Sequence, residues 1–288
     1  MYLQTNSLTL KGHLGVVWST FVVRIKTISR YKGMLFMDIL MPVFFAAMPI
    51  LLGQALAGSI SAASANFEQN TGMIGANYVA FIIIGANVFA TVTTSLWLFG
   101  FFIRREQTLG TLEALFMTPA HQISILAGLT LYVEIRSIIT FIGGYLFGCL
   151  IFSINPLQGD VLLAMGLLIF GLIPIYGLSF LLGALVMKVK QANALLNTLQ
   201  WVIGIFMGVF FPITVLPVTF QIIAYLFPGF WLNYSIQAAL MGLEWFFINM
   251  YGHLVVLFIF ALACPVFGYW VFSKTESRSK KGEGIGTF

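Results

Sequence analysis

The sequence predicts an all-α integral membrane protein, and three observations carry that prediction. Only 14 Lys and Arg and 9 Asp and Glu occur among 288 residues, a charged fraction of 8%, whereas a soluble domain carries about 25%. Apolar residues make up 60% of the chain, and the mean hydropathy is +0.98. Because a water-soluble fold of this size could not bury so much apolar surface, soluble enzymes, nucleic-acid-binding proteins and disordered regulators are excluded.

Six apolar stretches are predicted to cross the membrane. A helix needs about 20 apolar residues to span a hydrocarbon core about 30 Å thick. The predicted spans are Met34–Leu56, Tyr78–Ile103, Ser137–Ile154, Val161–Met187, Ala194–Phe211 and Trp245–Phe272. They divide the chain into a cytoplasmic N-terminus (1–33), a six-span domain (34–272) and a basic tail (273–288), whose Gly, Ser and Lys content predicts disorder.

The basic residues predict the orientation of the spans. All 14 Lys and Arg lie before the first span, in the connections that follow the second and fourth spans, or in the tail. In the other three connections the only charged residues are acidic, namely Glu68, Asp160 and Glu244. Because cytoplasmic loops are enriched in Lys and Arg, we expect both termini in the cytoplasm and the chain in the plasma (inner) membrane.

The segment before the first span is predicted to be an amphipathic helix lying at the cytoplasmic membrane surface. Its apolar residues recur on one narrow face: Leu14, Val17, Trp18, Phe21, Ile25 and Ile28. Lys26 and Arg30 point away from that face, and Arg24 and Lys32 add to the positive charge of the segment. A Trp together with cations is typical of interfacial helices. The alternative is a polar N-terminal segment whose basic residues reflect only the enrichment of Lys and Arg on the cytoplasmic side.

The segment Pro212–Glu244 is apolar enough for a seventh span, but its sequence argues against one. Pro212, Pro217 and Pro228 interrupt it, and a seventh span would place the basic tail outside. We therefore predict short re-entrant helices that enter the outer leaflet and return. Backbone of that kind must be buried in protein or line a wet cavity.

The sequence holds no constellation typical of an enzyme, a metal site or a nucleotide-binding site. Neither Lys that precedes a Thr belongs to a phosphate-binding loop, so any ATP that drives this protein is hydrolysed by another chain. His13 and His121 are predicted to be cytoplasmic, and His253 lies in the last span without an evident Ser or acid partner. Glu134 and Arg136 are expected at the cytoplasmic edge of the third span; a buried functional pair is the alternative.

The connection between the second and third spans holds the most informative run, from Arg104 to Pro119. Leu109, Leu112, Leu115 and Phe116 fall at helical spacing, which predicts a short amphipathic cytoplasmic helix that ends before Pro119. Its apolar stripe must meet either the membrane surface or a partner protein.

This run resembles the type-2 ABC exporter permease family, which includes drug-efflux, nodulation-factor and cell-surface glycan exporters. The similarity rests on Arg-Glu-x-x-x-Gly-Thr-Leu-Glu-x-Leu-x-x-Thr-Pro at Arg105–Pro119, on the basic helix before the first span, and on the Pro-rich segment before the sixth. It covers about residues 14–272.

The resemblance implies partners and roles. Two permease copies, expected to be a homodimer, would each dock a cytoplasmic ABC ATPase subunit that binds ATP and Mg, while this chain binds neither cofactor. The coupling helix in the ATPase cleft would comprise Gly110, Thr111, Leu112, Glu113, Thr118 and Pro119. The interfacial helix with Trp18 and its cations would lie near the ATPase, and the segment with Pro212, Pro217 and Pro228 would gate the exit.

The resemblance also implies a substrate path between the two permeases, along the second and fifth spans. Polar candidates for its wall are Asn87, Thr91, Thr94, Asn197, Thr198 and Gln200. Hydrogen bonding between spans would explain the presence of each of these residues equally well. The expected cargo is an amphiphilic small molecule or drug. Export of a lipid-linked glycan or lipid, an ATP-independent carrier, and a scaffold subunit remain alternatives.

Overall fold

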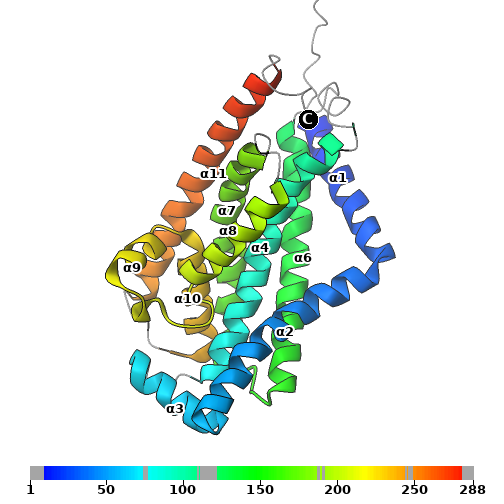
Figure 1. Ribbon diagram of the computed structural model, residues 1–288. Helices are drawn as coiled ribbons and strands as arrows, with labels where there is room; N and C mark the ends of the chain where they lie inside the picture. Colours follow the sequence, from blue (N-terminus) through cyan, green and yellow to red (C-terminus); the bar gives the residue numbers. More distant parts are fainter. Residues whose placement is uncertain are drawn as a thin grey trace, which may run out of the picture.

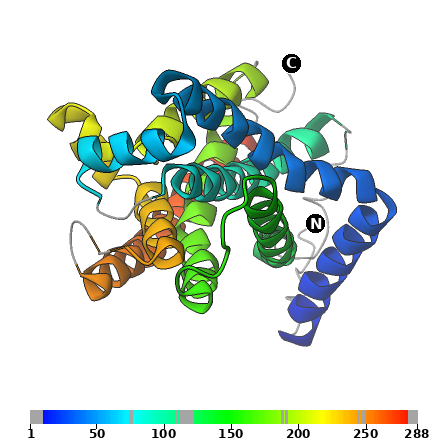
Figure 2. The same cartoon turned by 90° about the horizontal axis from the view of Figure 1, so that it is seen from below.

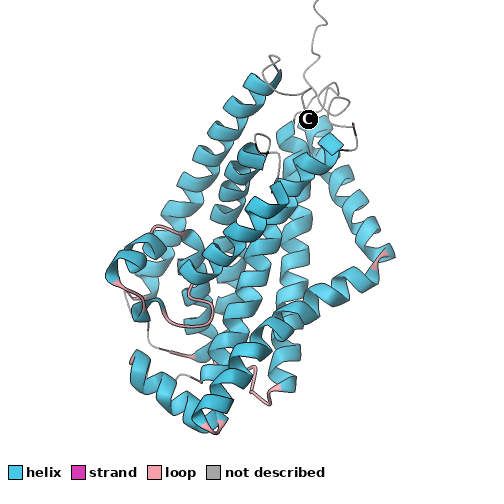
Figure 3. Ribbon diagram, in the orientation of Figure 1, coloured by secondary structure: helices cyan, strands magenta, loops and turns pink. Residues whose placement is uncertain are grey.

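The computed structural model describes residues 10–73, 77–108, 110, 122–186, 189, 192–243, 245 and 249–280. Within these residues the chain is helical and has no β-strand (Figure 1 and Figure 3). The α-helices are α1 (Leu10–Arg30), α2 (Lys32–Ala57), α3 (Ile60–Thr71), α4 (Tyr78–Thr108), α6 (Gln122–Ile151), α7 (Val161–Val186), α8 (Ala192–Phe206), α9 (Val218–Tyr225), α10 (Pro228–Met241) and α11 (Met250–Lys280), and a 3₁₀ helix covers Ile213–Val215.

Five helices, namely α2, α4, α6, α7 and α11, are long and apolar enough to cross a membrane, so this is a multi-pass membrane protein. Helix α4 lies near the centre of the bundle, which Figure 2 shows end-on, and it contacts α2, α6, α7 and α10. Of its most apolar 18-residue stretch, 89% is buried, against 11% for α11. Helix α4 is therefore surrounded by protein, whereas α11 presents most of its surface outward.

The third predicted span was placed wrongly at its start. Helix α6 begins at Gln122 rather than Ser137, and its 30 residues put Arg136 near its midpoint. The prediction treated Glu134 and Arg136 as markers of the membrane edge. In the structure each side chain has a partner on a neighbouring helix, so both charges fit inside the bundle.

The fifth predicted span was too long. Helix α8 has 15 residues and ends at Phe206 rather than Phe211, short of a full crossing. Gly208 follows in the left-handed conformation, with φ 66°, which stops the helix. The buried Asn233 of α10 donates from Nδ2 to the carbonyl oxygens of Met207 (2.9 Å) and Gly208 (3.3 Å), and so satisfies backbone acceptors at that end.

The prolines between α8 and α11 start short helices, as predicted. Pro212 precedes the 3₁₀ helix, Pro217 precedes α9, and Pro228 is in the first turn of α10. Every residue of α10 except Met241 is buried, and its Gln237 donates from Nε2 to the Phe81 carbonyl oxygen of α4 at 3.2 Å. This segment is thus held inside the protein, where the amide nitrogens of Asn233 and Gln237 donate to backbone carbonyl oxygens.

Two further segments differ from prediction. Helix α3 was not anticipated; Ser59 caps its N-terminus by accepting a hydrogen bond from the Ala62 amide at 3.1 Å. The tail was predicted to be disordered from residue 273, but α11 continues to Lys280. Just before this stretch, Phe272 packs on Phe180 of α7, with ring centroids 5.9 Å apart.

Helices α7 and α11 approach each other most closely at two glycines. A Cβ at Gly177 would overlap the backbone of Cys264 and Pro265, and a Cβ at Gly268 would overlap the Gly177 carbonyl oxygen. Such contact is typical of membrane helices that pack through small residues.

We expect Gly177→Val to destabilise the protein by about 1–3 kcal/mol, because the added atoms force α7 away from α11. Gly166→Val on the same helix is the control, since nothing lies within 4 Å of a Cβ there. In a Cys264→Ala background, a thiol-reactive dye would report thermal unfolding through the buried Cys149. Equal melting temperatures for the two variants would contradict the close packing.

Candidate functional site

A buried ion pair joins α6 to α2. The Arg136 guanidinium donates from Nε to Asp38 Oδ2 at 3.0 Å and also from Nη2 to the same oxygen. Its Nη1 donates to the hydroxyl of Tyr132, one helical turn earlier, at 3.4 Å. The Arg136 side chain is 6% exposed and that of Asp38 25%. Three donors of the guanidinium are thus engaged, which offsets the cost of burying its charge.

Glu134 lies on a different face of α6 from Arg136. The Tyr176 hydroxyl of α7 donates to its Oε2, while Oε1 is buried without a hydrogen-bond partner among the described residues. Glu134 and Arg136 therefore point to different helices and do not pair with each other. Arg136, which was expected at the cytoplasmic edge of the third span, is buried near the midpoint of α6.

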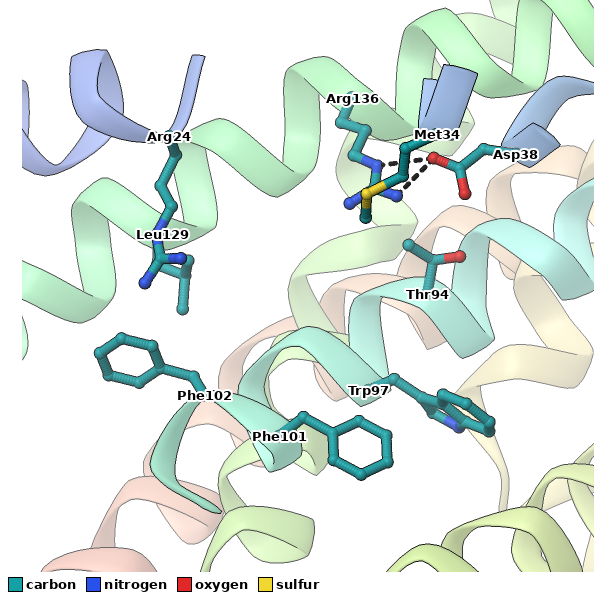
Figure 4. Close-up of a pocket in the computed structure, with 9 residues that line it drawn as sticks. All are labelled: Arg24, Met34, Asp38, Thr94, Trp97, Phe101, Phe102, Leu129 and Arg136. Carbon is teal, nitrogen blue, oxygen red and sulfur yellow. Dashed lines mark hydrogen bonds and ion pairs between the residues drawn. The ribbon is translucent and has the colours of Figure 1, made fainter. Parts of the chain in front are cut away.

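Two cavities meet at this ion pair. The α1–α6 cavity has a volume of about 300 Å³ and is shown in Figure 4. Its lining residues are Arg24, Met34, Asp38, Thr94, Trp97, Phe101, Phe102, Leu129 and Arg136. The α2–α8 cavity, about 620 Å³, is lined by Asp38, Met41, Pro42, Phe44, Phe45, Ala86, Phe89, Ala90, Thr93, Thr94, Trp97 and Gln200. Asp38, Thr94 and Trp97 belong to both, so they form the wall between them.

The predicted path residues divide into two groups. Thr94 lines both cavities, and Gln200 of α8 lines the α2–α8 cavity, as expected for a path between the second and fifth spans. The other four, Asn87, Thr91, Asn197 and Thr198, line neither cavity.

The four remaining side chains have other environments. Asn87 and Thr91 are buried in α4 and donate to backbone carbonyl oxygens of the same helix, those of Ile83 (2.8 Å) and Asn87 (2.9 Å). Asn197 and Thr198 lie on the exposed face of α8.

Sequence reasoning missed the most polar element of the cavity wall, Asp38. Its signal was available, because Asp38 is the one charged residue within the six predicted spans. A carboxylate in such a position marks a functional site by default. The aromatic residues around it could not be assigned to a cavity from sequence, since the chain contains 29 Phe.

The predicted interfacial helix forms as α1, and its apolar face is divided between two surroundings. Phe21, Ile25 and Ile28 pack against the core, whereas Leu14 and Trp18 are 63% and 62% exposed. An apolar surface left outside the bundle in this way suits a helix that also contacts lipid.

The cations on and beside α1 also differ from one another. The Arg24 guanidinium lies over the Phe102 ring of α4, 5.5 Å from its centroid. Lys26 and Arg30 are exposed. Lys32 was placed wrongly, since it begins α2 rather than belonging to α1.

His253 has a partner that the sequence did not reveal. Its Nδ1 lies 3.1 Å from the Ser235 hydroxyl of α10, and the ring is buried among Trp231, Tyr234 and Trp245. Because Ser235 lies in α10 and His253 in α11, we interpret the pair as a contact that holds these two helices together. Among the residues that the structure describes, no group of three or more His, Cys, Asp or Glu could hold a metal ion.

The predicted coupling helix lies almost wholly outside the described residues. Gly110 occupies a turn with φ 67°, directly after α4. The residues Thr111, Leu112, Glu113, Thr118 and Pro119 are not among the described residues, so their assigned role stays a prediction.

Comparison with known proteins finds no matching protein-family model and no significant match among curated proteins.

The ion pair is testable by a double-mutant cycle. We expect Arg136→Leu to destabilise the protein by about 3 kcal/mol, because it leaves the Asp38 carboxylate without its partner. The double variant Asp38→Leu/Arg136→Leu should recover most of that loss, since no charge is then stranded among apolar side chains. Thermal melts of the detergent-purified protein measure all four members of the cycle. Strictly additive effects would show that the two side chains do not stabilise each other.

Proposed function

We propose that this chain is the transmembrane permease subunit of an ATP-driven type-2 ABC exporter, which moves an amphiphilic small molecule out across the plasma membrane. The observation that carries the proposal is the α2–α8 cavity. It combines apolar and aromatic walls with a few polar groups, and its volume of about 620 Å³ is in the range of sites for drug-sized ligands. Met41 and Phe44 on its rim are 62% and 67% exposed, which leaves the cavity open at the side of the bundle.

The orientation follows from charge. The C-terminal ends of α4 and α11, which carry basic residues, lie on the side opposite α3, and α1 begins on that side too, although its C-terminal end lies nearer the middle of the molecule (Figure 1). Cytoplasmic segments are enriched in Lys and Arg. We therefore assign that side to the cytoplasm and α3 to the outside. Arg136, inside α6, no longer counts as a loop residue, and the remaining basic residues keep the same bias.

A conformational change in the ATPase would reach the cavity through α4 and α6, because the run Arg105–Pro119 connects these two helices. A partner ATPase that moves this connection would displace both of them. Helix α4 supplies about half of the residues that line the α2–α8 cavity, and α6 is tied to α2 through Arg136 and Asp38. Displacement of either helix would therefore change the shape of the site, as coupling between ATP binding and cargo affinity requires.

The exit gate is assigned to the segment with Pro212, Pro217 and Pro228. Its helices lie between the end of α8 and the start of α11, on the side assigned to the outside. The hydrogen bonds from Asn233 to the end of α8 link this segment to a helix that lines the cavity. A movement of α8 would in this way reach the gate directly.

An ATP-independent carrier is the second candidate, and the buried charges favour it. Carriers and proton-coupled transporters need ionisable groups at membrane depth, and Asp38, Glu134 and Arg136 all lie within membrane-spanning helices. Export of a lipid or lipid-linked glycan uses the same architecture as the first proposal. Dependence on ATP separates the carrier from both exporters.

The coupling assignment is tested by reversing one charge. Glu113→Lys should abolish ATP-driven uptake of a fluorescent amphiphile into inverted membrane vesicles, because the changed helix no longer fits its ATPase. Membrane insertion, measured by the amount of chain in the membrane fraction, should stay normal.

Glu68→Lys in α3 is the matched control, since it makes the same change on the side assigned to the outside. Normal uptake by Glu113→Lys would contradict the coupling role. Uptake that continues without ATP in the unaltered protein would favour the carrier instead.

A further inference from the structure

We propose that the α2–α8 cavity selects amphipathic cations, with Asp38 as the charge-recognising group and aromatic rings around it as the binding surface. The inference deepens the proposed function by naming the class of cargo, and in that respect it rests on it. The binding site itself can be tested on the chain alone.

The charge of the cavity is set by one residue. Among its lining side chains Asp38 is the only ionisable group, and Arg136 lines the neighbouring α1–α6 cavity instead. Both hydrogen bonds from Arg136 end on Oδ2 of Asp38. In Figure 4 the other carboxylate oxygen points away from the guanidinium. The α2–α8 cavity is thus lined by the carboxylate partner of the ion pair, and one oxygen of that carboxylate receives no hydrogen bond from Arg136.

The ion pair also prepares that carboxylate for a ligand. Arg136 holds the Asp38 carboxylate in position, because a guanidinium that donates twice to one oxygen restrains the side chain. A fixed carboxylate needs little rearrangement when a cation arrives, so less free energy is lost on binding. Three of the five N–H donors of Arg136 are engaged, and Arg136 does not line the α2–α8 cavity.

The remaining wall suits the body of an organic cation. Phe44, Phe45, Phe89 and Trp97 line the cavity, and Phe45 stacks on Phe89 with ring centroids 5.5 Å apart and planes at 15°. Aromatic faces attract cations, Trp most strongly, and also bury the apolar groups that an organic cation carries. Of the three uncharged polar side chains in the wall, Thr93, Thr94 and Gln200, the Thr93 hydroxyl already donates to the Phe89 carbonyl oxygen at 2.8 Å.

The test compares two probes of the same shape and opposite charge, tetraphenylphosphonium and tetraphenylborate. Binding to the full-length chain in lipid nanodiscs is measured by equilibrium dialysis, with protein-free nanodiscs subtracted. We expect the phosphonium to bind about tenfold more tightly than the borate. Asp38→Asn should weaken phosphonium binding by about tenfold and remove most of the difference between the probes.

Two further variants keep the test decisive. Asp160→Asn is the control for the loss of a carboxylate, because Asp160 caps α7 by accepting from the Leu163 amide at 2.9 Å and Asn can cap equally well. Trp97→Ala leaves the ion pair intact and should also weaken phosphonium binding about tenfold, so it tests the site even if Asp38→Asn fails to fold.

Each outcome has a defined meaning. Equal or tighter binding of the borate, or phosphonium binding that neither Asp38→Asn nor Trp97→Ala weakens, would overturn the cation site. Failure of the site would leave an ATP-driven exporter of another cargo class intact. Selective phosphonium binding without ATP-driven transport would support the site and count against the exporter.

Discussion

A guanidinium and a carboxylate meet inside the bundle, where Arg136 of α6 donates two hydrogen bonds to Asp38 of α2. Most other features of this region depend on that contact. Either charge alone would be costly among apolar helices, so the pair requires α2 and α6 to stay in register. It also lets α6 run as one helix of 30 residues through a point where an unpaired charge would have to reach water.

The same contact divides the space beside α4 into two cavities of different character. On one side lie Arg24 and Arg136, and on the other the free face of Asp38 with four aromatic rings. Helix α4 borders both, and the run Arg105–Pro119 begins where α4 ends. In the proposed exporter, a force applied at that run would act on the wall of the cargo site directly, without long-range transmission through the bundle.

Much of the fold was predictable because apolar length decides it: α2, α4 and α7 lie where hydropathy places them, and α11 overlaps the sixth predicted span but begins at Met250 instead of Trp245. The errors share one cause, which is tertiary contact. Inside α6, Glu134 and Arg136 have partners on neighbouring helices, and Asn233 of α10 binds the chain where α8 ends. Of the predicted path, Thr94 and Gln200 line a cavity, whereas Asn87 and Thr91 bond within their own helix; periodicity alone could not separate these cases.

Coupling to a separate ATPase is the central claim, and crosslinking tests it most directly. A photo-crosslinking residue at Leu112 or Ala114, activated in native membranes, would be followed by mass spectrometry of the captured molecules. The account predicts capture of a nucleotide-binding protein with a phosphate-binding loop. Capture of lipid alone, with no ATPase among the products, would contradict it and would place the connection between α4 and α6 on the membrane surface.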